Sequence, residues 1–128
     1  MANAIKPDKL AAEIAATLAE YRDAVNVITE ENVKQVMNEA RADVRQRSPQ
    51  SEPIGKSYKG HWRTRIIHEG HSITGYVYND KAGLTHLLEF GHAYVNGGRY
   101  QGVEHIAPAQ ETANEAIERG IKEGIRNL

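Results

Sequence analysis

The stretch from Asp8 to Arg47 reads DKLAAEIAATLAEYRDAVNVITEENVKQVMNEARADVRQR and holds neither glycine nor proline. Apolar residues recur in it at helical spacing, first at Leu10, Ile14, Leu18, Tyr21, Val25 and Ile28, then less regularly at Val33, Val36, Met37, Ala40 and Val44. This spacing gathers the apolar side chains on one face of an α-helix. The stretch therefore predicts an amphipathic N-terminal helix, around which the rest of the chain must fold.

The length of this helix raises a question of its own. One unbroken helix over residues 8–47 would be about 60 Å long, which is longer than a domain of this size is wide. The β-branched cluster at Val27, Ile28 and Thr29, followed by Glu30 and Glu31, has the composition of a helix end and restart. Either the helix breaks near Thr29, or it projects beyond its own domain, and projection would imply a partner.

The next segments predict a loop and a β-hairpin. Residues 48–57 contain Pro49, Pro53 and Gly55, and the prolines cannot continue the preceding helix. Residues 61–69 and 72–79 are rich in β-branched and aromatic residues, with a turn at residues 69–71. This pattern predicts a hairpin that offers one face to a core.

The last third of the chain predicts a short helix, an exposed turn and a final helix. Residues 84–90 favour a helix ending at Gly91, and residues 92–102 favour a glycine-rich turn between two short extended pieces. Pro108 fits the first position of a last helix, whose stripe of small and apolar residues consists of Ala109, Ala113, Ala116, Ile117, Ile121 and Ile125.

These elements together predict an α+β fold with a long N-terminal helix, a small antiparallel sheet built from hairpins, a short central helix and a C-terminal helix. At 128 residues the chain is long enough for one core. We expect a single domain over residues 1–128, with a helical arm at about 8–47 and an α+β core at about 58–128.

Composition excludes several classes of function. The chain has no cysteine, so disulfides, thiolate zinc sites and cysteine nucleophiles are ruled out. Its N-terminus lacks the apolar core of a signal peptide, and no run approaches the ~20 apolar residues that cross a bilayer, so no membrane contact is expected. The net charge of −1 argues against a dedicated nucleic-acid-binding domain.

The charge is unevenly distributed along the chain. Residues 41–65 hold seven basic and two acidic groups, whereas the segments on either side are both net acidic. The basic segment is either a solvated edge or a surface that faces DNA or an acidic partner subunit. The candidates for such a basic face are Arg41, Arg45, Lys56, Lys59, Arg63 and Arg65.

The chain contains six histidines, which raises the question of a metal site. Their spacing does not favour one, because no two histidines stand four positions apart on a helix and His68 and His71 would point to opposite faces of a strand. Glu89 and Glu104 flank the glycine-rich turn beside His92 and His105, an arrangement that could act in acid–base catalysis but that helix ends also gather without it. We expect no catalytic, metal-binding or cofactor-binding residue.

Aromatic residues on the glycine-rich turn point to a different role. Tyr94 and Tyr100 lie on either side of Asn96-Gly97-Gly98, and exposed tyrosines in such a turn are well suited to anchoring a partner surface. Tyr94, Asn96, Arg99 and Tyr100 are therefore the candidate partner-contact residues.

The segment LTHLLEFGHAYVNGGRYQGVEHIAPAQE, Leu84 to Glu111, resembles a family of tailed-bacteriophage minor tail or neck components, the head–tail joining proteins. The resemblance covers nearly the full length and rests on the order of several short motifs: Ser48-Pro49, Gly55 to Trp62, Thr85 to His92, Asn96 to Arg99, and His105 to Ala109. The chain departs from the family at Ile54, where a threonine usually stands.

The resemblance implies a structural role at the head–tail neck or the tail end, with no catalysis and no cofactor. It implies a ring-like homo-oligomer that contacts other phage neck and tail proteins and passing genomic DNA, located in the virion after synthesis in the bacterial host cytoplasm. Two alternatives from other classes stay open, a small metal-dependent nuclease or hydrolase that uses the histidines and a DNA-binding module that uses residues 41–65.

Overall fold

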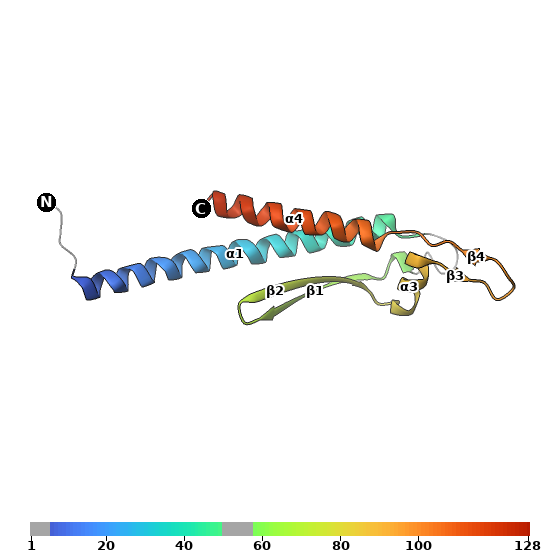
Figure 1. Ribbon diagram of the computed structural model, residues 1–128, viewed down its shortest axis with the longest axis horizontal. Helices are drawn as coiled ribbons and strands as arrows, with labels where there is room; N and C mark the ends of the chain where they lie inside the picture. Colours follow the sequence, from blue (N-terminus) through green and yellow to red (C-terminus); the bar gives the residue numbers. More distant parts are fainter. Residues whose placement is uncertain (1–5, 50–57) are drawn as a thin grey trace.

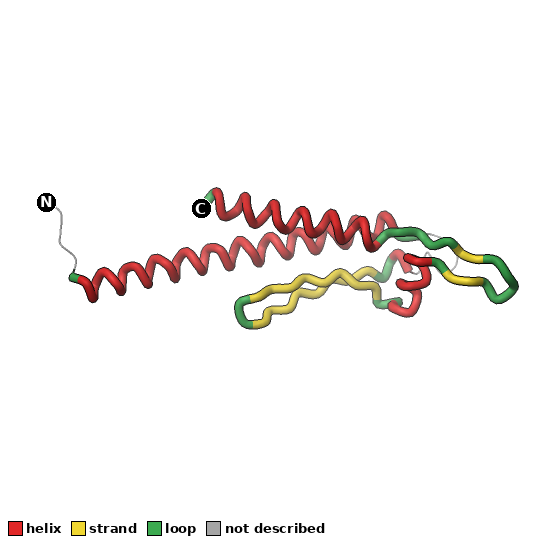
Figure 2. Tube along the Cα trace, in the orientation of Figure 1, coloured by secondary structure: helices red, strands yellow, loops and turns green. Residues whose placement is uncertain are grey.

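The computed structural model describes residues 6–49 and 58–128. In these ranges the chain forms a long helix α1, a hairpin β1–β2, a short helix α3, a small hairpin β3–β4 and a last helix α4 (Figure 1). Figure 2 shows the two long helices running together, with the β1–β2 hairpin also lying along α1. The arrangement confirms the α+β fold predicted from the sequence.

Helix α1 spans Pro7–Arg47 and is 41 residues long without interruption. Thr29 does not break it: the backbone stays helical through this residue, and the Thr29 hydroxyl donates a hydrogen bond to the Val25 carbonyl one turn earlier (2.8 Å). Of the two outcomes left open by the sequence, the structure therefore adopts the projecting helix. The helix ends before Pro49, where the Ser48 hydroxyl donates to the Val44 carbonyl (2.6 Å).

Strands β1 (Trp62–Glu69) and β2 (Ser72–Asn79) pair antiparallel in a register that runs from Trp62 opposite Asn79 to Glu69 opposite Ser72. One face of this hairpin packs on α1. Gly75 lies so close to the Met37 side chain that a β-carbon at Gly75 would overlap it. The hairpin therefore rests directly on the middle of α1, where Val33, Val36 and Met37 form one buried cluster.

Helix α3 (Ala82–Phe90) leads into β3 (His92–Ala93) and β4 (Arg99–Tyr100), which pair antiparallel. Gly91 and Gly102 have φ of 85° and 80°, and each lies where a β-carbon would overlap the backbone of the opposite segment. Only glycine tolerates both conditions, so these two positions let the chain return close to α3. The Val103 N–H donates to the Leu88 carbonyl there (2.8 Å).

Helix α4 (Ile106–Arg126) runs antiparallel to α1, with Gly120 against Asn32 and Gly124 against Ile28 (Figure 1). The prediction that Pro108 is its first residue is wrong by two positions, because the helix begins at Ile106. Near the N-terminus of α4, a second buried cluster brings α1, β1, α3 and α4 together. Its residues are Val44, Tyr58, Trp62, Leu88 and Ala109. No helix in the described ranges is long and apolar enough to cross a membrane.

Candidate functional site

The N-terminus of α4 is capped by a carboxylate from another helix. Glu89, near the end of α3, accepts hydrogen bonds from the backbone N–H groups of His105 (2.8 Å), Ile106 (3.0 Å) and Ala107 (3.1 Å). These N–H groups have no partner inside their own helix, and the positive end of the helix dipole favours a negative charge beside them. The Glu89 side chain thus fixes where α4 starts.

The environment of Glu89 keeps it ionised. Burial, at 6% exposure, would by itself raise the pKa of the carboxyl. The three backbone hydrogen bonds and the nearby His105 ring act in the opposite direction and outweigh burial, so the pKa of Glu89 lies below its ordinary value of 4.5. A carboxylate with this pKa is poorly suited to act as a general acid at neutral pH.

His105 and Tyr58 complete a buried network with Glu89, and both are fully buried at 0% exposure. The His105 Nδ1 lies 2.7 Å from the Val103 carbonyl and 2.9 Å from a Glu89 carboxylate oxygen, both of which only accept hydrogen bonds. We therefore assign the proton to Nδ1, which leaves Nε2 to accept from the Tyr58 hydroxyl (2.5 Å). Burial raises the pKa of Tyr58 to about 12, so this hydroxyl keeps its proton.

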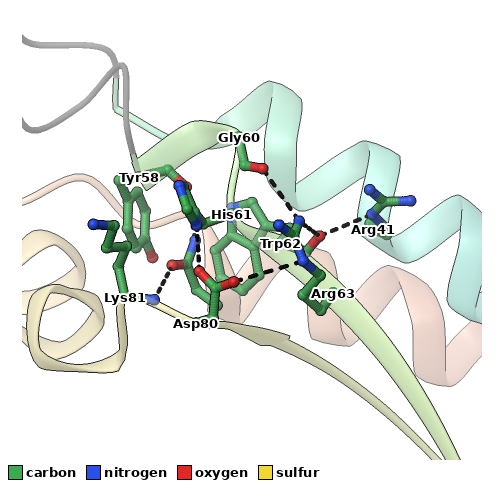
Figure 3. Close-up of polar contacts among 9 residues, drawn as sticks. Arg41, Tyr58, Gly60, His61, Trp62, Arg63, Asp80 and Lys81 are labelled. Carbon is green, nitrogen blue, oxygen red and sulfur yellow. Dashed lines mark hydrogen bonds and ion pairs between the residues drawn. The ribbon is translucent and has the colours of Figure 1, made fainter.

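Trp62 ties this network to the base of the hairpin and to α1. Its ring meets those of Tyr58 and His105 edge-on, at centroid distances of 5.5 and 5.9 Å. The Trp62 indole N–H donates to the Ser48 hydroxyl at the end of α1 (2.8 Å), and the Trp62 carbonyl accepts from Arg41 (2.9 Å; Figure 3). Every polar group of the network is thereby used to hold elements together.

A tyrosine, a histidine and a glutamate in one chain of hydrogen bonds have the residue types of a catalytic triad. The geometry does not support that function, because a molecule in solution reaches neither Tyr58 nor His105 without opening the core. The chemistry available to this arrangement is therefore structural. It joins the C-terminal ends of α1 and α3 and the start of α4 to the base of the β1–β2 hairpin at Trp62.

The base of the hairpin carries a second, exposed polar cluster, drawn in Figure 3. The Asp80 carboxylate lies 2.5 Å from the His61 Nδ1 and 3.6 Å from the Arg63 Nε, and all three side chains are about 40% exposed. Asn79 closes the base from the other side, since its amide donates to the Tyr58 carbonyl and accepts from the Lys81 N–H, both at 2.8 Å. The cluster links the two strands at their open end.

The remaining histidines do not converge. His68 contacts Glu30 on α1 (3.3 Å), while the His86 and His92 rings pack against Phe90 and Tyr100 respectively. In residues 6–49 and 58–128 no three His, Asp or Glu side chains are grouped as they would be around a metal ion.

The predicted basic face is divided between two surfaces. Arg41, Arg45 and Lys59 line a shallow groove of about 400 Å³, together with Asn38, Ala42 and Gln46. None of these described residues carries a carboxylate. Arg65 instead projects from the hairpin, opposite Tyr76 in the strand register, and Arg63 pairs with Asp80. Lys56 lies outside the described residues.

The predicted partner-contact residues lie at the end of the molecule that carries β3 and β4. Tyr94 is exposed at 51%, and Asn96 and Arg99 are also exposed, with Arg99 donating to the Phe90 carbonyl (3.2 Å). Tyr100 is half-buried and packs on the His92 ring (centroid distance 5.4 Å) and on the core.

Other large apolar residues at this end were not singled out from the sequence. Phe90, Val95 and Val103 are exposed at 64%, 102% and 42%. The sequence held a signal for Phe90, because it falls off the stripe formed by Leu84, Leu87 and Leu88 and so points away from the core.

Comparisons of the chain with protein-family models, with curated proteins and with solved structures find no match.

Proposed function

We propose that this chain is a structural assembly protein of a tailed phage or prophage. In this proposal it acts at the head–tail neck or the tail end, as an oligomer that contacts further copies of itself and other neck and tail proteins. The proposal takes its phage setting from the motif order between Ser48 and Ala109. It assigns the chain no catalytic step.

One observation carries the proposal: the polar motif residues are buried, whereas large apolar residues are exposed. Glu89 belongs to the motif Thr85 to His92 and His105 to the motif His105 to Ala109. These two side chains are only 6% and 0% exposed, and both make hydrogen bonds inside the core. Leu18 and Tyr21 at one end, and Phe90 and Tyr94 at the other, are each more than half exposed. Apolar side chains left at both ends of an elongated chain are typical of a subunit that buries them against neighbours.

The proposal is tested in the phage or prophage that encodes the chain. Deleting its gene should leave filled heads and tails that do not join into infectious particles, and supplying the chain in trans should restore joining. Gold-labelled antibody against the chain should mark the neck or the tail end of intact virions. Wild-type infectivity after deletion, or absence of the chain from purified virions, would refute the proposal.

Contact with DNA is a second candidate function, favoured by the groove at Arg41, Arg45 and Lys59. The described residues that line it are basic or carry amides, apart from Ala42, and none of them is acidic, a composition suited to phosphate groups. Arg45→Gln should weaken binding of duplex DNA and lower its salt dependence by about one phosphate contact. Lys122→Gln on α4, where the lysine pairs with Glu118, is the matched control and should leave binding unchanged. Equal effects of the two substitutions, or no binding at low salt, would exclude this function.

A further inference from the structure

The N-terminal part of α1 extends past the end of its partner helix. Gly120 and Gly124 of α4 lie on Asn32 and Ile28 of α1, and the two helices run antiparallel, so Leu128 reaches only to about the level of residue 24. Figure 1 shows α1 continuing well beyond this point. We call residues 7–23 the α1 extension. It is roughly 25 Å long.

The extension carries an apolar stripe that no other element within residues 6–49 and 58–128 covers. Leu10, Ile14, Leu18 and Tyr21 are 44%, 51%, 62% and 52% exposed. The stripe repeats every seven residues, with Ala11, Leu18 and Val25 on one row and Ile14, Tyr21 and Ile28 on the other. A seven-residue repeat of two rows is the pattern by which helices pack side by side.

This stripe is the continuation of an interface that already exists. Ile28 belongs to one of its rows, and Asn32, seven positions after Val25, belongs to the other, and both lie under α4. The hairpin packs on a different side of α1, at Val33 and Met37. The surface that α4 covers at one end of α1 therefore continues along the extension, where none of the described residues packs on it. The occupant that fits this surface is a helix that prolongs the line of α4.

We propose that the extensions of two copies of this chain pack antiparallel against each other. In this arrangement the extension of each copy continues the path of the other copy's α4. A twofold axis crosses the pair near residue 16. The contact would specify how copies of the chain associate, and its role in the virion rests on the proposed function. The contact itself can be tested on the isolated chain.

The side chains of the extension complement one another in this direction. When Ile14 is set opposite Leu18 of the second copy, Ala11 falls opposite Tyr21, so a small residue faces a large one. The flanking positions then bring Asp8 within reach of Arg22, and symmetry repeats this ion pair. In a parallel pair these two flanking positions would lie on opposite sides of the seam, so Asp8 and Arg22 could not form this ion pair. The charges therefore favour the antiparallel pair.

Light scattering and sedimentation of the full chain test the pairing. The wild-type chain should dimerise, and Ile14→Glu or Leu18→Glu should prevent this contact because each places two charges inside the seam. Ala16→Glu, on the opposite face of the extension, is the matched control and should leave association unchanged. A wild-type chain that stays monomeric up to its solubility limit, or equal loss in all three variants, would overturn the proposal. Circular dichroism should be the same for all, since these positions are exposed.

Charge reversal tests the direction of the pair. Asp8→Arg alone and Arg22→Asp alone should each weaken association, by roughly twofold to tenfold. The two changes in one chain should restore it. If the double variant is no tighter than the single ones, the antiparallel alignment is wrong.

Cysteine labelling gives an independent answer, because the natural chain has no cysteine. A short thiol-reactive cross-linker should join two copies of Ala15→Cys, which lies beside the twofold axis. It should not join Ala11→Cys, which faces Tyr21 of the other copy, or Ala16→Cys, which faces outward. Cross-linking at position 11 as strong as at position 15 would indicate a parallel pair and refute the proposal. Neither outcome of the cross-linking bears on the phage role, which the gene deletion and the antibody labelling of virions test separately.

Discussion

The Glu89 carboxylate accepts a hydrogen bond from the backbone N–H of His105, 16 positions further along the chain, at 2.8 Å. This contact joins the end of α3 to the start of α4 across the glycine-rich segment between them. Because Tyr58 and Trp62 pack on the same His105 ring, one carboxylate organises the meeting point of all the larger elements. The polar residues at this meeting point stabilise the fold.

Glu89→Gln should lower the free energy of unfolding by about 1–3 kcal/mol. The glutamine keeps one acceptor oxygen but presents an N–H₂ group to backbone N–H donors, so at least one buried donor loses its partner. Urea unfolding followed by circular dichroism measures the change. Glu104→Gln, at an exposed position, should shift stability by less than about 0.5 kcal/mol. Equal effects at the two positions would show that the Glu89 contacts contribute no stability.

Stability should fall as the pH drops below about 4.5, and Glu89 should account for part of the loss. The pKa of this carboxyl is lower in the folded chain than its ordinary value of 4.5, so the folded state binds the proton less readily than the unfolded state. Its contribution is complete above the unfolded pKa and is lost as the pH falls through the folded pKa. The difference in urea midpoint between wild type and Glu89→Gln should therefore narrow at acid pH. A difference that stays constant with pH would show that ionisation of Glu89 does not cause the loss of stability.

The Tyr58 hydroxyl should ionise at a higher pH than an unperturbed phenol, because burial raises its pKa. Its pKa is about 12 in the folded chain and 10.0 when unperturbed, so its contribution to stability is present below about pH 10 and declines as the pH rises above that value. Ultraviolet titration should show one phenol ionising late or together with unfolding. In Tyr58→Phe that late step should be missing, and its persistence would assign it to another tyrosine.

The periodic parts of the fold could be predicted from the sequence because their signals are local. The spacing of apolar residues on α1 and α4 and the composition of the hairpin required no knowledge of distant contacts. The local sequence predicts the start of α4 at Pro108, two positions late, because the capping residue Glu89 comes from another helix and no local pattern indicates such a cap. The sequence alone does not decide whether α1 continues through Thr29 for a related reason, since β-branched residues weaken a helix that packing against α4 then supports.

The surfaces were predictable in part. Tyr94 is exposed at the turn, as its glycine-rich surroundings indicated, whereas Tyr100 packs inward because its β4 position pairs with His92. The basic segment predicted one face, but strand geometry sends Arg65 and Arg41 to different surfaces, since neighbouring segments of sequence need not share a side in space. The helical spacing of the apolar residues from Leu10 to Tyr21 predicts the stripe on α1 from the sequence alone. Only the structure shows that α4 ends before it reaches these residues.

Gly124→Ala should destabilise the chain by about 1 kcal/mol, even though alanine is the better helix former. A β-carbon at Gly124 would overlap the Cγ2 methyl of Ile28, so α4 and α1 must move apart. Gly83→Ala in α3, where nothing lies within 4 Å of the added carbon, should be neutral or slightly stabilising. Thermal unfolding compares the two variants. Ile28→Ala should remove most of the penalty at Gly124 in a double-mutant cycle, because the methyl that collides is gone. Additive effects of the two substitutions would mean that the helices are not in contact at this point.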